Sequence, residues 1–168
     1  MHDLAAPPGA PAFPAVLGDA VRDAADDFFR ATCGLKYAEQ PDRASEAAAG
    51  IMSTISFVGD QPWSFSLVLP DCTAVAMARA FAGFDIPADS ADMGDVIGEV
   101  VNVIAGGICA RLEAKGIKTQ MSLPMVVRGE NVSVMVPSGA STKHLEFVGP
   151  NGPCWFSLVK SRTAGVKR

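Results

Sequence analysis

One long stretch in the middle of the chain limits what this protein can fold into. Residues 94–115, GDVIGEVVNVIAGGICARLEAK, have the periodicity of an amphipathic helix. At about 100° per residue, a wide apolar face is formed by Val96, Ile97, Val100, Val101, Val103, Ile104, Ala105, Ile108 and Leu112. A narrow stripe on the other side holds Asp95, Glu99, Asn102, Gly106 and Glu113. Glu99 and Asn102 therefore point the same way, one turn apart.

Two further helices are predicted before this one. The first runs from Ala15 to about Leu35, with apolar residues on one face and an end near Gly34. The second covers residues 72–83, with Asp71 as its N-cap and Gly83 as its stop. Either Ser90 or Asp92 is suited to cap the long helix.

The remaining segments are predicted to be strands. Residues 48–58 and 63–70 flank the turn-like sequence GDQP and are expected to form a hairpin. After the long helix, four strands are expected, at residues 118–129, 131–137, 143–149 and 154–162. Pro124 cannot donate a ladder hydrogen bond, so its strand is expected at a sheet edge or with a bulge there.

One internal repeat indicates the overall plan. FVGDQPWSFSLV (57–68) and FVGPNGPCWFSLV (147–159) differ in length by one residue in the turn. Two similar hairpins in one small domain suggest a duplicated, pseudo-twofold structure. We therefore expect an α+β fold of two layers, with about six antiparallel strands and the long helices on one face.

The length of 168 residues is typical of a single domain. We expect a Pro- and Ala-rich flexible leader at residues 1–14, one domain at 15–162 and a basic tail at 163–168. The start lacks the charged and apolar regions of a signal peptide. No uninterrupted apolar run reaches the roughly 20 residues of a membrane span, because Glu99 and Asn102 divide the best candidate. A cytoplasmic protein without a membrane span is expected.

Charge and cysteine content exclude other classes. The formal net charge is −4, which gives no basic footprint for nucleic acid. The four cysteines, Cys33, Cys72, Cys109 and Cys154, lack zinc-ligand spacing, and we expect them to be reduced and mostly buried. No metal site is expected. His144 is expected to be a surface or hydrogen-bonded strand residue and not a catalyst, because no Ser-His-Asp arrangement has independent support in the sequence.

The stripe of the long helix resembles the active helix of the CheX/CheC/FliY family of chemotaxis phosphatases. In that family an Asp or Ser, a Glu four residues later and an Asn three residues after that precede a Pro by some twenty residues. Asp95, Glu99, Asn102 and Pro124 match this pattern. The resemblance extends loosely over residues 15–162 and is nearest to the CheX branch.

The resemblance implies a function for these residues. The family's substrate is an aspartyl-phosphorylated response-regulator receiver domain of the CheY type, which brings its own Mg²⁺, so no cofactor of the chain's own is implied. Asn102 would orient the attacking water and Glu99 would bind a lysine of the receiver, while Asp95 and Gly106 would contact this partner. The CheX branch also implies a homodimer. The alternative is a non-catalytic adaptor or flagellar-switch-like module that only docks receivers.

Two points stay open at the level of sequence. Gly98, Gly106 and Gly107 each cost a helix about 1 kcal/mol relative to Ala, and close packing inside the protein could account for all three. The repeat makes the first helix the counterpart of the long one, with Asp23 in place of Glu99 and Asp26 in place of Asn102. This difference predicts one working site per protomer.

Overall fold

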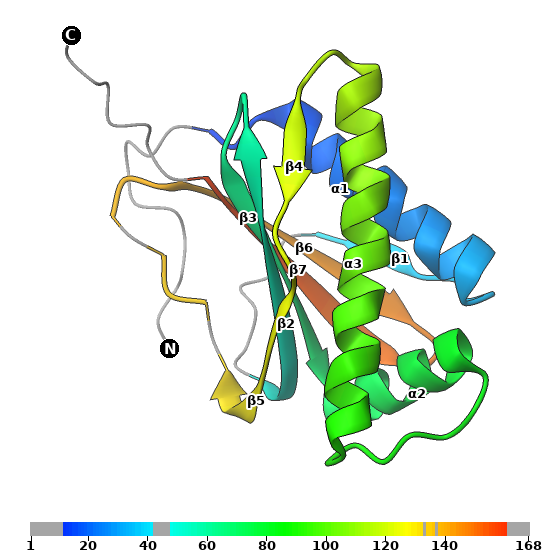
Figure 1. Ribbon diagram of the computed structural model, residues 1–168. Coiled ribbons are helices and arrows are strands. Elements are labelled where there is room, and N and C mark those ends of the chain that lie inside the picture. Colours follow the sequence, from blue (N-terminus) through cyan, green and yellow to red (C-terminus); the bar gives the residue numbers. More distant parts are fainter. Residues whose placement is uncertain (1–11, 42–47, 133, 137, 161–168) are drawn as a thin grey trace, which may run out of the picture.

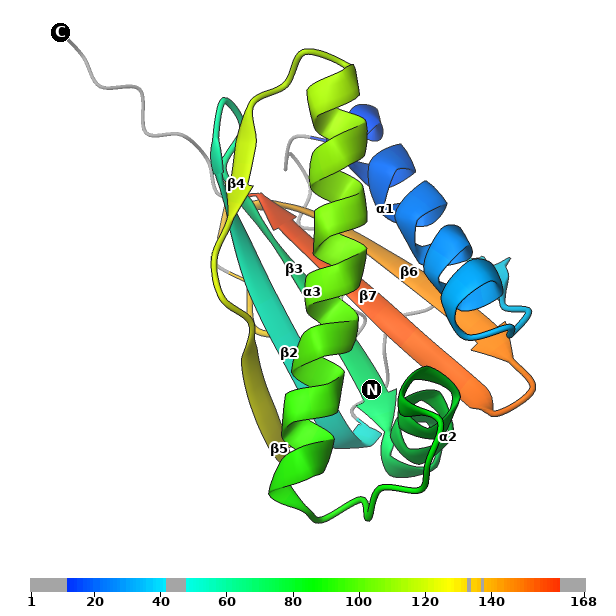
Figure 2. The same ribbon diagram turned by 45° about the vertical axis from the view of Figure 1, so that its right-hand side comes forward.

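The computed structural model describes residues 12–41, 48–132, 134–136 and 138–160, in which a seven-stranded sheet carries helices on one face (Figures 1 and 2). The helices are α1 (Ala15–Asp27), which continues into a π-helix (Phe28–Thr32), α2 (Asp71–Ala82) and α3 (Ala91–Ala114). The strands are β1 (Ala38–Gln40), β2 (Ala48–Gly59), β3 (Trp63–Pro70), β4 (Thr119–Met121), β5 (Met125–Val132), β6 (Ser141–Gly149) and β7 (Gly152–Lys160). The predicted α+β, two-layer class is confirmed. The predicted leader up to residue 11 and the basic tail lie outside the described residues.

The long helix α3 forms because its apolar face is buried against the sheet. It starts three residues earlier than its periodicity predicted, and Ser90 is the cap: its Oγ accepts a hydrogen bond from the Met93 backbone N–H at 3.2 Å. Ile97, Val101 and Ile108 have no exposed surface. Val103, which the periodicity placed on the apolar face, is instead 39% exposed.

The sheet confirms the pseudo-twofold plan. Its strand order is β1-β6-β7-β3-β2-β4, with β5 also paired to β2, and every pairing is antiparallel. The two repeated hairpins, β2–β3 and β6–β7, meet where Ser66 pairs with Ser157. These serines are equivalent positions of the repeat, so the pseudo-twofold axis passes between them.

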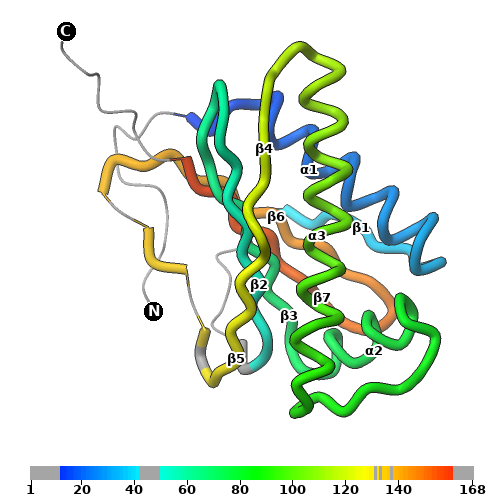
Figure 3. Tube along the Cα trace, in the orientation of Figure 1, coloured from blue at the N-terminus to red at the C-terminus, as the bar shows by residue number. Residues whose placement is uncertain are grey.

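The strand predictions needed two corrections. The predicted strand 118–129 is broken at residues 122–124, so that β4 and β5 follow one another along the outer edge of β2 (Figure 3). The expected edge position of Pro124 is therefore confirmed. The strand predicted at 131–137 is wrong, since β5 ends at Val132 and residues 134–136 belong to no strand. The edge strand β1 was missed because its three exposed residues carry no alternation of polarity.

The first helix ends in an irregular turn. Residues 28–32 form a π-helix, and both Phe28 and Phe29 at its start are buried in the core. Gly34, near which the helix was predicted to end, follows with φ of 64°.

The second helix differs from its prediction at one end. It begins at Asp71, with Pro70 and not Asp71 at the N-cap position and no side-chain cap. Gly83 stops it in the left-handed conformation, as predicted, with φ of 85°.

Within the described residues, α3 is long and apolar enough, by length and composition alone, to cross a membrane. Its packing explains that composition, because the sheet and α1 cover the side that carries most of its apolar residues.

Candidate functional site

The outward stripe of α3 contains the four residues that the sequence assigned to catalysis and partner binding. Asp95 and Glu99 are exposed, and Asn102 and Gly106 are half-buried. Asn102 Nδ2 donates to Glu99 Oε2 at 3.4 Å, so the two side chains lie together. A bond of this length is weak, which leaves the carboxamide able to turn toward another partner.

The charge on this stripe is concentrated in its first half. Asp92, Asp95 and Glu99 are exposed in the first turns, whereas residues 102–110 contain no charged side chain. Arg111 follows, but it turns toward α1, where its guanidinium donates to the Asp23 carbonyl at 3.3 Å and pairs with the Asp27 carboxylate. The exposed surface around Glu99 is therefore acidic and suited to a cationic group of a partner.

Packing inside the protein explains two of the four glycines of α3, Gly98 and Gly107, but not Gly94 or Gly106. A Cβ on Gly107 would lie 3.3 Å from Ala24 of α1, and one on Gly98 would lie 3.4 Å from Val126 of β5. A Cβ on Gly106 would meet nothing within 4 Å. Gly106 thus carries the helix cost of a glycine without a close contact inside the described chain to require it.

The broken edge strand borders the stripe. Pro124 packs toward α3, with its Cγ 3.7 Å from the place of a Cβ on Gly98. Gly98 is one turn before Asn102 on the helix, so the Pro124 turn flanks the Glu99–Asn102 pair. The family pattern that contains Asp95, Glu99, Asn102 and Pro124 is therefore gathered in one place.

The corresponding surface of α1 is occupied by ion pairs. With Gly18 aligned to Gly94, Asp26 corresponds to Asn102, and its carboxylate is 3.1 Å from the guanidinium of Arg30. Arg30 stands where Gly106 stands on α3. Arg22, the counterpart of Gly98, reaches Glu39 of β1 at 2.7 Å and Asp19 at 3.2 Å. Interaction of Arg22 with Glu39 raises the pKa of its guanidinium.

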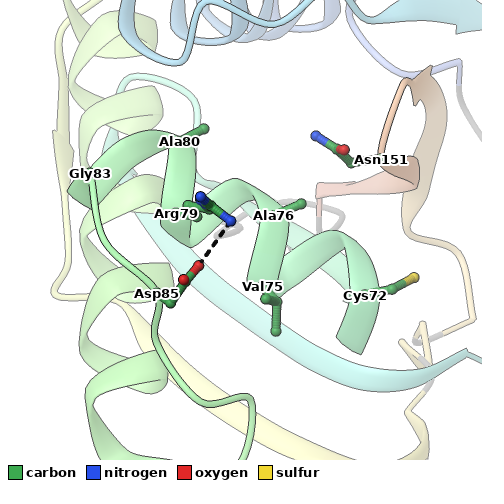
Figure 4. A pocket seen from close by; sticks show the side chains of 8 residues that line it. All are labelled: Cys72, Val75, Ala76, Arg79, Ala80, Gly83, Asp85 and Asn151. Carbon is green, nitrogen blue, oxygen red and sulfur yellow. Dashed lines mark ion pairs between the residues drawn. The ribbon is translucent and has the colours of Figure 1, made fainter.

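A surface pocket of about 530 Å³ lies elsewhere, against α2 (Figure 4). Arg79 and Asp85 form an ion pair of 3.3 Å at one end, and Cys72 and Asn151 lie at the other. None of the residues that line this pocket belongs to the α3 stripe. Its only full charges already neutralise one another, so it offers no evident centre for chemistry.

In the part of the chain that the structure describes, the cysteines and His144 do not provide a nucleophile with its base. Burial raises the pKa of the Cys33 thiol to about 11 and also raises the pKa values of Cys109 and Cys154. Cys72 is exposed, which contradicts the expectation of burial for that residue, while Cys154 is buried and Cys33 and Cys109 are partly so.

His144 Nδ1 lies 3.0 Å from Ser157 Oγ across the β6–β7 ladder, at the place that Thr54 and Ser66 occupy in the other hairpin, 2.9 Å apart. Within the described part of the chain, no three His, Cys, Asp or Glu side chains cluster in a way that could hold a metal ion.

The family model described as chemotaxis phosphatase CheX matches residues 51–147, more than half of the chain. The chain belongs to the CheX family. The match covers α3 with its stripe, the Pro124 turn, most of the β2–β3 hairpin and β6 up to Phe147, whereas β7 lies outside it. No curated protein matches the chain in sequence.

Solved structures of CheX proteins have the same fold at low identity. CheX from Desulfovibrio desulfuricans is 20% identical, with a TM-score of 0.77 over 86% of this chain and 99% of its own. CheX from Vibrio vulnificus is 17% identical, with a TM-score of 0.78 over the same shares. CheX from Borrelia burgdorferi, solved in a complex with CheY, BeF₃ and Mg²⁺, is 20% identical, with a TM-score of 0.70 over 86% of this chain and 96% of its own.

The sequence missed the apolar residues at the border of the stripe. Met121, which ends the edge strand β4, is 38% exposed, and Leu123, in the break between β4 and β5, is 87% exposed. They had been included in a continuous strand, where alternate residues are expected to be covered. The signal that could have identified them is Pro124, which cannot donate a ladder hydrogen bond and so marks an interruption of the strand next to them.

Proposed function

We propose that this protein dephosphorylates an aspartyl-phosphorylated receiver domain of the CheY type and thereby ends a two-component signal. The observation that supports this function is the Glu99–Asn102 pair on an exposed helix stripe, beside Pro124, in a chain of the CheX family. The solved complex of the similar Borrelia protein with CheY supports a receiver domain as the partner.

The reaction is hydrolysis of an acyl phosphate. Water attacks the phosphorus in line, the bond from phosphorus to the aspartate oxygen breaks, and the products are a receiver carboxylate and inorganic phosphate. The receiver's own Mg²⁺ stabilises the charge on the phosphoryl oxygens, so the missing element is an oriented water. Asn102 supplies it, because a carboxamide offers both a donor and an acceptor and does not depend on protonation.

Glu99 binds the partner. Its carboxylate is exposed, lies within reach of Asn102 and is surrounded by the acidic first half of the stripe. A lysine beside the receiver's phosphoryl site would pair with it and bring the phosphate over the carboxamide. Asp95 adds to the acidic field, and Gly106 leaves room for the partner's backbone.

The assembly and location follow the same proposal. We expect a cytoplasmic homodimer formed through an edge of the sheet, whose outermost strands are β1 with part of β6 on one side and β4 with β5 on the other. Analytical ultracentrifugation of the full chain tests this: a sedimentation coefficient of a monomer at micromolar concentration would contradict it.

The function is tested by the lifetime of a phosphorylated receiver from the same cell, with and without the protein. The wild type should shorten it, and Asn102→Ala should reduce the turnover about a hundredfold, or about 2.7 kcal/mol of transition-state stabilisation, while receiver binding is kept. Asn151→Ala removes an amide from the distant β6–β7 turn and is the matched control. Full activity of a folded Asn102→Ala variant would rule out the role of Asn102. Binding of the receiver by wild type without any change in lifetime would favour the docking module.

A further inference from the structure

The border between α3 and the sheet edge carries exposed apolar side chains that nothing in the proposed chemistry uses. Met121, at the end of β4, pairs with Phe57, whose side chain is buried on the helix side of the sheet. Met121 therefore also faces the helix side. Leu123, in the break that follows, is 87% exposed. We name these two residues the apolar shoulder.

The shoulder lies level with the Glu99–Asn102 pair. Pro124 fixes the level, because it packs next to Gly98. β4 runs antiparallel to α3, so the chain traced back from Pro124 through β4 leads toward the C-terminal end of the helix, as Figures 1 and 2 both show. Three extended residues span about 10 Å, which equals roughly seven residues of helix, so Met121 lies at about the level of Gly106. Leu123, one extended residue before Pro124, lies about two helix residues beyond Gly98, at about the level of Val100.

The orientation of the helix brings these levels into one surface. Gly98 faces the sheet edge. Viewed down the helix axis, Asn102 is rotated from Gly98 by about 40° and Gly106 by about 80°. Asn102 is thus the polar residue of the stripe that leans toward the shoulder. Beyond it, Gly106 has open space where a side chain would stand.

The partner that fits is the receiver itself, and this step rests on the proposed function. A receiver whose phosphoryl group lies over Asn102 contacts the protein surface on both sides of Asn102. On one side it meets the acidic residues around Glu99, and on the other it meets an uncharged surface made of the shoulder and Gly106. Addition of a strand from a second copy is disfavoured at this point, because the ladder stops after the bond from Ser122 N–H to the Ser56 carbonyl and Pro124 has no N–H to donate.

We infer that Met121 and Leu123 form an apolar docking surface for the receiver beside the Glu99–Asn102 pair. Charge then anchors one side of the partner and apolar contact anchors the other. The shoulder sets affinity, whereas Asn102 sets the rate of the chemical step. Apolar contact is insensitive to salt, so its loss should leave the salt dependence of binding unchanged.

The chain provides a matched control on the same edge. Met125 and Val127 are 62% and 39% exposed, but they pair with Thr54 and Met52, whose side chains point to the face of the sheet without helices. The double variant Met121→Ser/Leu123→Ser removes the shoulder without adding charge, and Met125→Ser/Val127→Ser removes similar apolar side chains from the other face. All four positions are at least partly exposed, so both double variants are expected to fold.

The test is a binding titration of each full-length variant with a receiver loaded with beryllofluoride and Mg²⁺, followed by turnover of the phosphorylated receiver. The shoulder variant should bind about tenfold more weakly, with the wild-type salt dependence and with kcat at saturation within about twofold of wild type. The control variant should bind within about twofold of wild type.

Equal binding by the shoulder variant and wild type would overturn the inference, and so would an equal loss in the control variant. A shift of the shoulder variant from dimer to monomer with unchanged receiver affinity would assign the shoulder to a second copy and would also overturn it. If wild type binds the receiver and Glu99→Ala weakens that binding, the proposed function survives any of these outcomes. If wild type neither binds nor dephosphorylates receivers, both proposals fail.

Discussion

Two helices occupy equivalent places in the two halves of this fold, and only one of them has an accessible carboxamide. On α3, Asn102 lies in an open stripe next to Glu99, with bare Gly106 one turn further on. On α1, the equivalent Asp26 is paired with Arg30, which stands at the place of Gly106. The two halves of the fold thus present similar helices, and a few surface residues make these helices different.

The difference extends to the neighbouring sheet edges. Next to α3, Gly98 lets Pro124 and Val126 pack closely against the helix. The equivalent Arg22 on α1 instead reaches out to Glu39 of β1. The regular part of α1 also ends at Asp27, where the π-helix begins, whereas α3 continues to Ala114. A partner that needs a long, bare helix finds it only on α3.

Gly106→Arg gives α3 the arginine that α1 has at the equivalent position, Arg30. This substitution has the largest expected effect on receiver binding. The new guanidinium would reach back to Glu99 or Asn102, as Arg30 reaches Asp26, and it would fill the space that the partner needs. We expect receiver binding to weaken at least about tenfold, or about 1.4 kcal/mol, in a titration with a beryllofluoride-loaded receiver.

Gly94→Arg is the control for this substitution. A side chain at Gly94 also meets nothing within 4 Å, but it stands two turns before Asn102. Its binding should stay within about threefold of wild type. Equal losses for both arginine variants would show that added positive charge, and not the space at Gly106, is responsible.

Substitutions of Glu99 test the charged side of the same surface. Glu99→Ala should weaken receiver binding about fivefold, and Glu99→Gln nearly as much, because charge and not shape is what a lysine needs. Added salt should weaken wild-type binding more than that of Glu99→Gln, as measured by titrations between about 50 and 300 mM NaCl. The same salt dependence for both proteins is incompatible with an ion pair.

The smallest expected effects are on stability and come from the adjacent Gly106 and Gly107 of α3. They separate the intrinsic cost of a glycine in a helix from the cost of close packing. Gly106→Ala should raise the free energy of unfolding by about 1 kcal/mol, because the methyl group enters open space. Gly107→Ala should gain less or lose stability, since its Cβ would lie 3.3 Å from Ala24 and from the Arg111 guanidinium. Urea unfolding of both variants measures this. Equal gains would mean that α1 and α3 are not as tightly packed at Gly107 as described.

The sequence predicted the parts of this structure that depend on periodicity. The stripe of α3, the β2–β3 hairpin and the pseudo-twofold plan all follow from the spacing of residues within the sequence itself. The break at Pro124 was anticipated only as an edge or a bulge, because its outcome depends on which strand lies beside it. The resemblance assigned Gly106 to the partner surface, but the sequence left internal packing as an alternative, since only the folded structure distinguishes a glycine that faces a neighbour from one that faces open space.

The residues of the candidate site also divide into those that a local pattern predicts and those that depend on distant parts of the chain. Glu99 and Asn102 were predicted from a local pattern, and they lie together because one helix carries both. Met121 and Leu123 were missed, since their exposure depends on the position of β4 at the edge of a sheet that is completed by distant residues. The ion pair of Arg22 with Glu39 was missed for the same reason, because it joins a helix to a strand that the sequence did not indicate.

The central claim is that α3 alone carries the working site, and the most direct test is the dephosphorylation rate of a double variant on α1. Asp23→Ala/Asp26→Ala removes the counterparts of Glu99 and Asn102 from the first helix. An ionised carboxylate has no hydrogen to donate to a water, and Asp26 is held by Arg30, so the rate should stay within about twofold of wild type, a change under roughly 0.5 kcal/mol. Asn102→Ala, measured beside it, should be about a hundredfold slower. A large loss of rate in a folded double variant would mean that the first helix is a second working site and would contradict the account.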